Sequence, residues 1–166
     1  MPAADLPGCE AIAKAIHVAH PEDAGRMGER LRLFPAGCRV LRRGGRIVGY
    51  GVSHPWTARD APALNTPLAR LPARADALLI HDLALLPEAR GRGEARGFVA
   101  AAAAIAVARG FGIVSLVAVS GAAGFWAEMG FRVVAVPALG AVLRSYDAEA
   151  CYMERDPASD AGGCSS

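Results

Sequence analysis

The chain is poor in the residues that mark several protein classes. Of its 18 basic residues only Lys14 is a lysine, aromatic residues make up 6% of the sequence, and the formal net charge is only +2. A nucleic-acid-binding domain would need a broader basic face than this. Arg42, Arg43 and Arg46 do cluster, but two glycines separate them, which is typical of a solvated hairpin turn. We therefore expect no nucleic-acid partner.

Cysteine patterns and long apolar runs are also missing. The four cysteines, Cys9, Cys38, Cys151 and Cys164, form no C-x-x-C pair, and no histidine stands at ligand spacing to them, so we expect no metal. The alanine-rich run over 99–108 is too short to span a bilayer. The N-terminus lacks the charged segment and apolar run of a signal peptide. We therefore expect no membrane partner, reduced thiols and a cytoplasmic location.

What is present is a hydrophobic chain of single-domain size. With 166 residues, of which 53% are hydrophobic, it can bury a sizeable core. We expect one domain over residues 1–156 and a disordered tail over 157–166. Residues 1–4 are too few and too irregular to predict a first strand with any strength.

The order of the predicted elements indicates an α+β fold. Apolar periodicity and helix-breaking residues predict helices over 6–19, 21–33, 94–109 and 122–129. Strands are predicted over 38–42, 46–53, 77–86, 113–119, 131–136 and 149–154. The run 113–119 is almost continuously apolar, which is typical of a buried parallel strand. Residues 55–74 form a long loop that either shapes a substrate site or merely connects two strands.

The most informative segment is Leu83-Ala-Leu-Leu-Pro-Glu-Ala-Arg-Gly-Arg-Gly-Glu-Ala95, which reads as a strand, a turn, a glycine-rich loop and the start of a helix. Glycines let a backbone approach a ligand closely, and the first turn of a helix offers free amides and a positive dipole end to an anion. Arg90 and Arg92 add charge that suits phosphate oxygens. The segment predicts a phosphate-binding loop, although a solvated turn is the alternative on local sequence alone. It lacks the Gly-Lys-Ser/Thr of a P-loop and the third glycine of a dinucleotide fingerprint.

With Arg-x-x-Gly-x-Ala between a central strand and its helix, the chain resembles the GNAT superfamily of acyl-CoA-dependent N-acyltransferases over about residues 38–154. A second segment, Phe125-Trp-Ala-Glu-Met-Gly-Phe131, looks like that family's Phe-Tyr-x-x-x-Gly-Phe signature. The resemblance implies a mixed β-sheet, flanked by helices on both faces, that splays where two parallel strands separate. Acetyl-CoA would lie in the opening as the co-substrate.

The same resemblance implies the coenzyme-binding residues. The main chain of one strand end would pair with the pantetheine arm, the amides of the glycine-rich loop would hold the pyrophosphate, and the Trp of the second motif would pack against the coenzyme. The residues so predicted are Leu83, Ala84, Leu85, Arg90, Gly91, Arg92, Gly93, Glu94, Ala95 and Trp126.

The implied reaction is direct attack of an amine on the thioester in a ternary complex, for which the amine must first lose a proton. His81 is the candidate base, because imidazole titrates near neutral pH and because a histidine at the matching position is the suspected base of the arylalkylamine N-acetyltransferases, which this segment resembles. Asp82 would face away from His81 in a regular strand. It orients His81 or a turn, or acts as the base if a β-bulge, expected near residues 82–85, shifts the register. The alternative is that both are paired within the core.

The proton donor for the coenzyme A thiolate is open. Many relatives carry tyrosine where this chain has Trp126, and an indole N–H is no acid. Ser120, Tyr146 and Tyr152 are alternatives, as is unaided departure, because a thiol has a pKa of only about 8.5.

We therefore expect an N-acetyltransferase that uses the primary amine of a small molecule as the acceptor. The alternatives are a protein or peptide N-terminal acetyltransferase and a non-catalytic acyl-CoA-binding module. The sequence shows no acidic cluster that would indicate an aminoglycoside or polyamine, so it does not name the acceptor. It also leaves a homodimer open.

Overall fold

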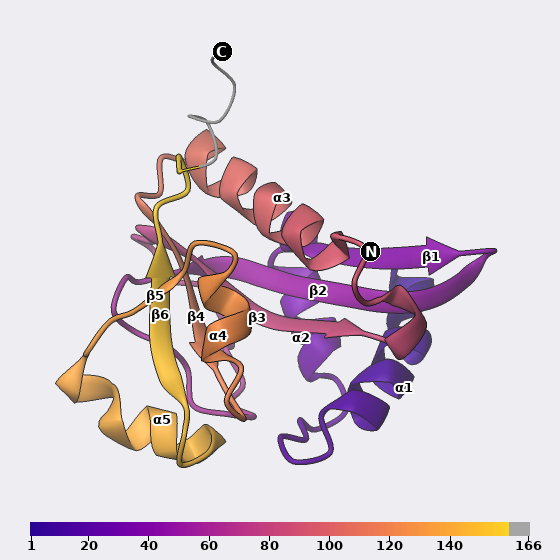
Figure 1. The fold of residues 1–166 in the computed structure, drawn as a ribbon, viewed down its shortest axis with the longest axis horizontal. Coiled ribbons are helices and arrows are strands. Elements are labelled where there is room, and N and C mark those ends of the chain that lie inside the picture. The colour runs from indigo at the N-terminus through magenta and orange to yellow at the C-terminus, as the bar shows by residue number, and fades with distance from the viewer. Residues whose placement is uncertain (160–166) are drawn as a thin grey trace.

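The computed structural model describes residues 1–159 and places a mixed β-sheet at the centre of the molecule (Figure 1). Its six strands lie in the order β1-β2-β3-β4-β6-β5. They are β1 (Cys38–Arg43), β2 (Arg46–Trp56), β3 (Ala77–Leu85), β4 (Ile113–Ala118), β5 (Arg132–Val133) and β6 (Cys151–Arg155). Strands β3 and β4 are parallel, and the other neighbours are antiparallel. The predicted mixed sheet is confirmed.

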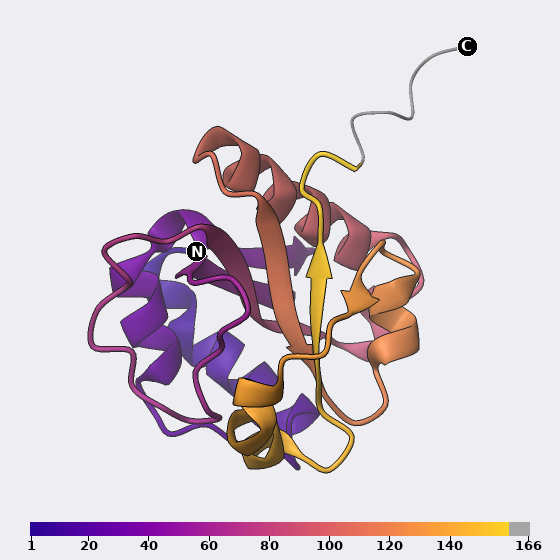
Figure 2. The ribbon, with the colours of Figure 1, turned by 90° about the vertical axis from the view of Figure 1, so that its left-hand side faces the viewer.

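Helices cover both faces of this sheet, as Figures 1 and 2 show from two sides. The helices are α1 (Leu6–Ile16), α2 (Arg26–Leu33), α3 (Glu94–Ala108), α4 (Ala123–Ala127) and α5 (Gly140–Tyr146). Helices α1 and α2 bury a cluster against β1, β2 and β3 that includes Ile12, Leu31 and Val52. Helix α3 covers the opposite face. None of the helices in the described chain is long and apolar enough to cross a membrane.

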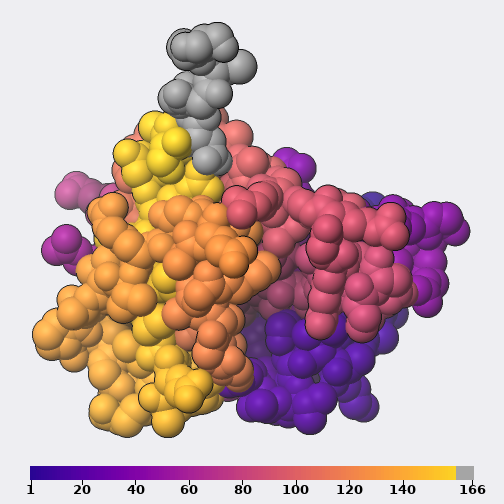
Figure 3. Space-filling view, in the orientation of Figure 1, coloured from indigo at the N-terminus to yellow at the C-terminus, as the bar shows by residue number. Residues whose placement is uncertain are grey.

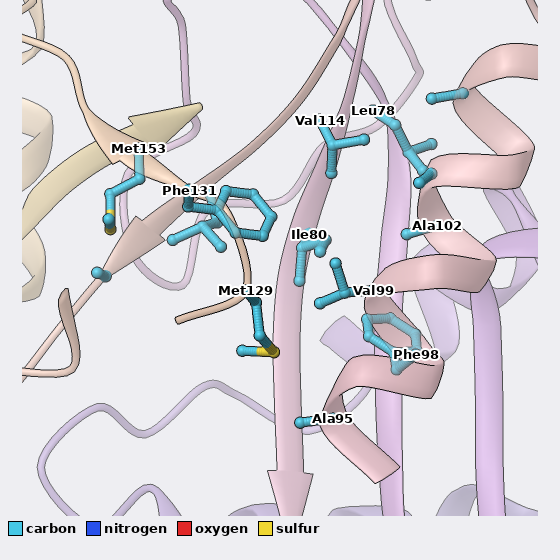
Figure 4. Packing of buried hydrophobic residues seen from close by; sticks show 14 of the residues in the cluster. Leu78, Ile80, Ala95, Phe98, Val99, Ala102, Val114, Met129, Phe131 and Met153 are labelled. Atoms are coloured by element: carbon cyan, nitrogen blue, oxygen red, sulfur yellow. The ribbon is translucent and has the colours of Figure 1, made fainter. Parts of the chain in front are cut away.

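The larger core lies beneath α3, where small residues let the helix approach the sheet closely. Phe98, Val99 and Ala102 of α3 face Leu78 and Ile80 of β3, and methionines from neighbouring strands and loops complete the cluster (Figure 4). On β2 the approach is closer still. A Cβ at Gly51 would lie 2.3 Å from a ring carbon of Phe98, so only glycine fits there.

Strands β3 and β4 separate halfway along their length. They pair only from Ala77 opposite Ile113 to Ile80 opposite Leu116, whereas β3 continues against β2 as far as Leu85 and β4 pairs with β6 up to its end. Residues 81–85 of β3 therefore have no partner on the β4 side. The splay that the family resemblance implied is present.

Several predicted boundaries move. Helix α1 ends at Ile16 rather than at residue 19, and α2 begins at Arg26 rather than at residue 21. Between them lies a connector of turns, residues 17–25, which contains Pro21 and ends at Gly25 with a φ of +86°. The predicted strand 131–136 shortens to two residues, Arg132–Val133, and three residues without regular structure lead from it to the 3₁₀ turn at Pro137–Leu139. Helix α5 was not predicted, since a seven-residue helix carries little periodicity.

The two ends of the described chain contain short turns. Near the N-terminus, Ala3–Asp5 form a 3₁₀ turn, and no strand precedes β1 in the described chain. The amino group of Met1 donates to the carbonyl oxygen of Cys38 at 2.7 Å. Of the tail that was expected to be disordered, residues 157–159 form a turn in which the amide of Ser159 donates to the carbonyl of Asp156. Residues 160–166 lie outside the described residues, and the expectation for them stays a prediction.

Candidate active site

A cavity of about 700 Å³ opens where β3 and β4 separate. The strands contribute apolar side chains to its lining, among them Ile80, Leu83 and Leu116. One wall comes from α1 and the 17–25 connector, and the other comes from the segment around α4 and from the end of α5. In Figure 3 the indigo N-terminal segment and the orange segment of α4 meet on the face turned toward the viewer. The volume suits a small ligand, because such sites commonly occupy about 300–1,000 Å³.

A β-bulge places both predicted catalytic residues on this cavity. Val52 of β2 lies opposite Asp82 but Ser53 lies opposite Ile80, so His81 is the extra residue. In a regular strand neighbouring side chains point to opposite faces, and a bulge breaks that alternation. Both His81 and Asp82 consequently line the cavity. The expected bulge exists but lies just before residues 82–85, so β3 is not the regular strand in which Asp82 would face away from His81.

The partner of His81 is Glu22, from the 17–25 connector. Its Nε2 lies 3.2 Å from Oε2 of Glu22 and 3.3 Å from Oε1. Another partner of that carboxylate is Arg30, whose side chain is 1% exposed and whose Nη2 donates to Oε1 at 3.2 Å. Burial alone would raise the pKa of Glu22, but the bond and charge of His81 and the charge of Arg30 outweigh it and hold the pKa at about 2. Glu22 is therefore a carboxylate at neutral pH.

Asp82 has different partners from those expected. Oδ1 of Asp82 lies 2.8 Å from Nε2 of His17, which ends α1, and Oδ2 accepts a hydrogen bond from the hydroxyl of Tyr50. Contact with Asp82 raises the pKa of His17 above its ordinary value; burial opposes this, and the charges of Asp82 and Glu22 add to it. Burial and then Asp82 raise the pKa of Tyr50, so the phenol stays a donor. The suggestion that Asp82 orients His81 is wrong.

The chain's histidines gather at this end of the molecule. His17, His20 and His81 line the cavity, and His54 lies fully buried behind His81 with ring centroids 5.7 Å apart. Burial, followed by the charge of His81, lowers the pKa of His54 to about 3. His54 is therefore neutral, and its ring packs against that of His81 with an angle of 40° between the two planes.

The sequence reasoning missed Glu22, His17, Tyr50 and Arg30, because nothing in their spacing connects them. It also missed the acidic character of the cavity, to which Glu10, Glu22, Asp23 and Asp82 contribute. Two basic side chains, Lys14 and Arg26, line the same space. No group of three histidine, cysteine, aspartate or glutamate side chains in residues 1–159 is arranged to hold a metal ion.

The predicted coenzyme loop has the conformation that its glycines suggested. Gly91 and Gly93 have φ values of +70° and +80°, and Gly93 directly precedes α3. The first backbone bond of α3 runs from the amide of Gly97 to the carbonyl of Gly93 at 2.9 Å, so the amides of the first turn have no partner within the helix. Ala95 is buried where α3 packs on the sheet. The loop thus presents free amides at the positive end of a helix dipole.

Charged side chains brace this loop from several directions. Nε of Arg90 donates to the carbonyl oxygen of Leu85 at 3.0 Å and ties the loop to the end of β3. Arg43, at the tip of the β1–β2 hairpin, pairs with Glu94 at 2.8 Å. Arg92 is exposed. The two other arginines of the cluster at the hairpin tip also form ion pairs, Arg42 with Asp5 and Arg46 with Glu88. The interpretation of this cluster as a hairpin turn is confirmed.

The three remaining predicted coenzyme residues on β3 divide between the two faces. Leu83 and Leu85 pack against the α3 cluster, whereas Ala84 is buried in the α1–α2 cluster. On the far wall, Trp126 is half-buried and stacks edge-on against Phe125 and Phe131, with centroids 5.2 and 5.6 Å away. Trp126 lines the cavity, as does Leu83.

Each of the three side chains suggested as proton donors in place of a tyrosine has another hydrogen-bond partner. The hydroxyl of Tyr146 donates to the carbonyl of Pro62 at 2.9 Å, and burial raises its pKa. The hydroxyl of Tyr152 accepts the amide of Arg59, and Tyr152 is 1% exposed. Ser120 is bound through its amide and hydroxyl to Asp147. Of the three only Tyr146 lines the cavity.

Comparison with known proteins identifies the family. Residues 9–131 match the model of the acetyltransferase (GNAT) family, and the chain belongs to that family. A search of curated protein sequences finds no match.

Solved structures share the fold. One is a GphF GNAT-like decarboxylase in complex with isobutyryl-CoA, with 18% identity, a TM-score of 0.74, and 95% of this chain and 97% of that chain covered. Another is Chaetomium thermophilum Naa20 with a bisubstrate analogue, with 20% identity, a TM-score of 0.70, and 94% and 84% covered. A third is N-acetylglutamate synthase from Neisseria gonorrhoeae with coenzyme A and N-acetyl-glutamate, with 15% identity and a TM-score of 0.70; 93% of this chain spans 33% of that one.

Proposed function

We propose that this protein transfers an acetyl group from acetyl-CoA to the primary amine of a small molecule. The observation that carries the proposal is the continuity of the site. The unpaired edge of β3, residues 81–85, leads from the glycine-rich loop into a cavity lined by an imidazole that faces a carboxylate. A thioester held along that edge would reach His81 directly.

The coenzyme would lie along this edge with its pyrophosphate on the loop amides. The main chain of 83–85 would pair with the pantetheine amides as an added strand would. The first-turn amides of α3 and the side chain of Arg92 would bind the pyrophosphate. Trp126 would pack against the coenzyme from the far wall. The coenzyme A and isobutyryl-CoA present in structures of the same fold support a CoA thioester as donor.

In the proposed reaction His81 accepts a proton from the substrate ammonium group. The carboxylate of Glu22 stabilises the imidazolium that forms, in the manner of other base–carboxylate pairs. The neutral nitrogen then attacks the thioester carbon, and the carbon–sulfur bond breaks. No side chain bonds to the acetyl group, so the transfer takes place within a ternary complex.

A contact across the cavity favours a small acceptor over a peptide. Nε2 of His20, from the 17–25 connector, lies 2.9 Å from Oδ2 of Asp147, between α5 and β6. The same carboxylate oxygen accepts the amide of Ser120 at 2.8 Å. Asp147 thus joins the two walls of the cavity, whereas a polypeptide would need an open groove. The long loop supports this wall, because Arg26 and Glu29 of α2 bind the backbone of residues 65–69.

A cytoplasmic location is also proposed. The described cysteines are free, and burial, the largest cause, raises the pKa of Cys9 and of Cys38 to about 11. Such thiols react slowly. The fold therefore does not depend on an oxidising compartment for these thiols.

The test is a panel of small amines, polyamines and short peptides with free N-termini, assayed for acetyl-CoA-dependent release of coenzyme A. Turnover with a small amine and none with peptides supports the proposal. Turnover with peptides alone would favour the N-terminal acetyltransferase alternative. A rise in melting temperature with acetyl-CoA but no turnover with any amine would favour a non-catalytic binding module.

A further inference from the structure

We propose that His17 is the group that gives a proton to the departing coenzyme A thiolate. The inference rests on the proposed acetyl transfer. Because Trp126 stands where many relatives carry a tyrosine, that reaction has no assigned donor of a proton to the thiolate. His17 is the C-cap residue that follows α1, outside both family motifs, and is brought to β3 only by the packing of α1 on the sheet.

The position of His17 suits a donor at the thioester. Its side chain is 27% exposed and lines the cavity, and its Nε2 lies 2.8 Å from Oδ1 of Asp82. Asp82 is the residue before Leu83, where the proposed pantetheine path enters the cavity. Under the proposed function, the imidazole of His17 therefore lies near the position of the thioester sulfur. Asp82, which holds it there, belongs to β3, the strand along which the coenzyme would lie.

The charged surroundings of His17 favour its protonated form. Asp82 faces it from β3, and Glu22 adds negative charge from the 17–25 connector. Tyr50 of β2 is neutral and donates to Asp82. On its own helix Lys14 lines the same cavity, but His17 is the C-cap residue of α1, where the helix dipole favours a cation.

The two imidazole–carboxylate pairs of the cavity differ in a way that assigns their tasks. Glu22 divides its charge between His81 and the buried guanidinium of Arg30. Asp82 has no second cation among the described residues: its Oδ1 faces His17 and its Oδ2 accepts a hydrogen bond from the neutral hydroxyl of Tyr50. His17 is thus the better-supported donor, and His81 is left to accept a proton.

The alternatives within the cavity are weaker. Trp126 carries only an indole N–H. The hydroxyl of Tyr146 is engaged by the carbonyl of Pro62, and burial moves its pKa upward, which makes it a poorer acid. Tyr152 and Ser120 do not line the cavity.

The proposed step balances as follows. The substrate ammonium loses one proton to His81, and the nitrogen lone pair forms the new bond to the carbonyl carbon. The electron pair of the carbon–sulfur bond leaves with sulfur, which takes a proton from His17. The nitrogen loses its second proton as the amide forms, and that proton restores His17 through water. His81 releases the first proton to solvent, so one proton is produced for each acetyl group transferred.

The test is a pH titration of the thiol of coenzyme A bound to the full chain. The ultraviolet absorbance of the thiolate reports its ionisation. A protonated imidazole beside the sulfur stabilises the thiolate, so the bound thiol should ionise below the value of about 8.5 for a free thiol. In His17→Gln this shift should be lost, and in His20→Gln, which changes the other connector histidine, it should remain. With an amine found by the panel, His17→Gln should lower kcat by about 100-fold or more and remove the alkaline limb of the pH profile.

An unchanged thiol titration in His17→Gln with coenzyme A still bound would overturn the inference. Should His17→Gln fail to fold, Asp82→Asn replaces it. That variant keeps His17 but removes its counter-charge, so the bound thiol should again ionise near the free value, and an unchanged titration would count equally against the inference. If the wild-type protein binds no coenzyme A, the proposed function fails instead, which separates the two failures.

Discussion

Nε2 of His81 lies 3.2 Å from Oε2 of Glu22, although 59 residues separate the two in the sequence. The first comes from a bulge in β3 and the second from the connector between α1 and α2. The buried guanidinium of Arg30 holds the carboxylate from behind. A base with a fixed counter-charge therefore faces the cavity.

Replacing Glu22 with glutamine should lower kcat/KM by roughly 10- to 100-fold, because the imidazolium that forms on His81 loses its negative partner. The effect should lie mainly in kcat. The neighbouring Asp23→Asn is the matched control, since that side chain is 68% exposed and, within residues 1–159, pairs only with Arg26. Steady-state kinetics with acetyl-CoA measure both. Equal activity of Glu22→Gln and Asp23→Asn would remove Glu22 from the mechanism.

Gly93→Asp should abolish the rise in melting temperature that acetyl-CoA gives the wild-type protein, because its carboxylate would repel the pyrophosphate. The control is Gly110→Asp at the other end of α3. Both glycines have positive φ values, +80° and +71°, with open space around them. Each variant should therefore lose about 1–2 kcal/mol of stability from backbone strain alone. A retained acetyl-CoA shift in Gly93→Asp would place the coenzyme elsewhere.

Gly51→Ala should destabilise the protein by about 1–3 kcal/mol, because its Cβ would lie 2.3 Å from the ring of Phe98. In contrast, Gly97→Ala should be neutral or stabilising by up to about 1 kcal/mol, because alanine favours a helix over glycine. A Cβ at Gly97 would meet no neighbouring atom within 4 Å. Chemical denaturation without ligand compares them. A stable Gly51→Ala would show that α3 can move away from β2.

The stability contributed by the pair of His17 and Asp82 should depend on pH. The pKa of His17 is raised in the folded state, so this contribution is fully present below the unfolded value of about 6.5 and is lost as pH rises through the folded value. His17→Gln should thus be most destabilised relative to wild type in mildly acidic solution. The gap in melting temperature should narrow toward alkaline pH. A gap that widens with pH would contradict the direction of the shift.

The conformation of the glycine-rich loop is predictable from sequence, and the grouping of side chains around His81 and Asp82 is not. Gly91 and Gly93 stand next to the helix that they start, so local chemistry indicates their conformation. Glu22, Tyr50 and His17 carry no such signal, because only the packing of α1 and the connector against β3 brings them to His81 and Asp82. The bulge matters most: a strand read by strict alternation sends Asp82 to the wrong face.

The connector of residues 17–25 supplies Glu22, His20 and His17 to the cavity but contains no regular helix or strand. Chain segments of this kind tolerate exchange better than the elements they join. Under the proposed function, this connector lies apart from the glycine-rich loop that would bind the pyrophosphate of the donor. A different connector that keeps His17 and Glu22 between the same two helices is therefore expected to change the acceptor without altering that loop.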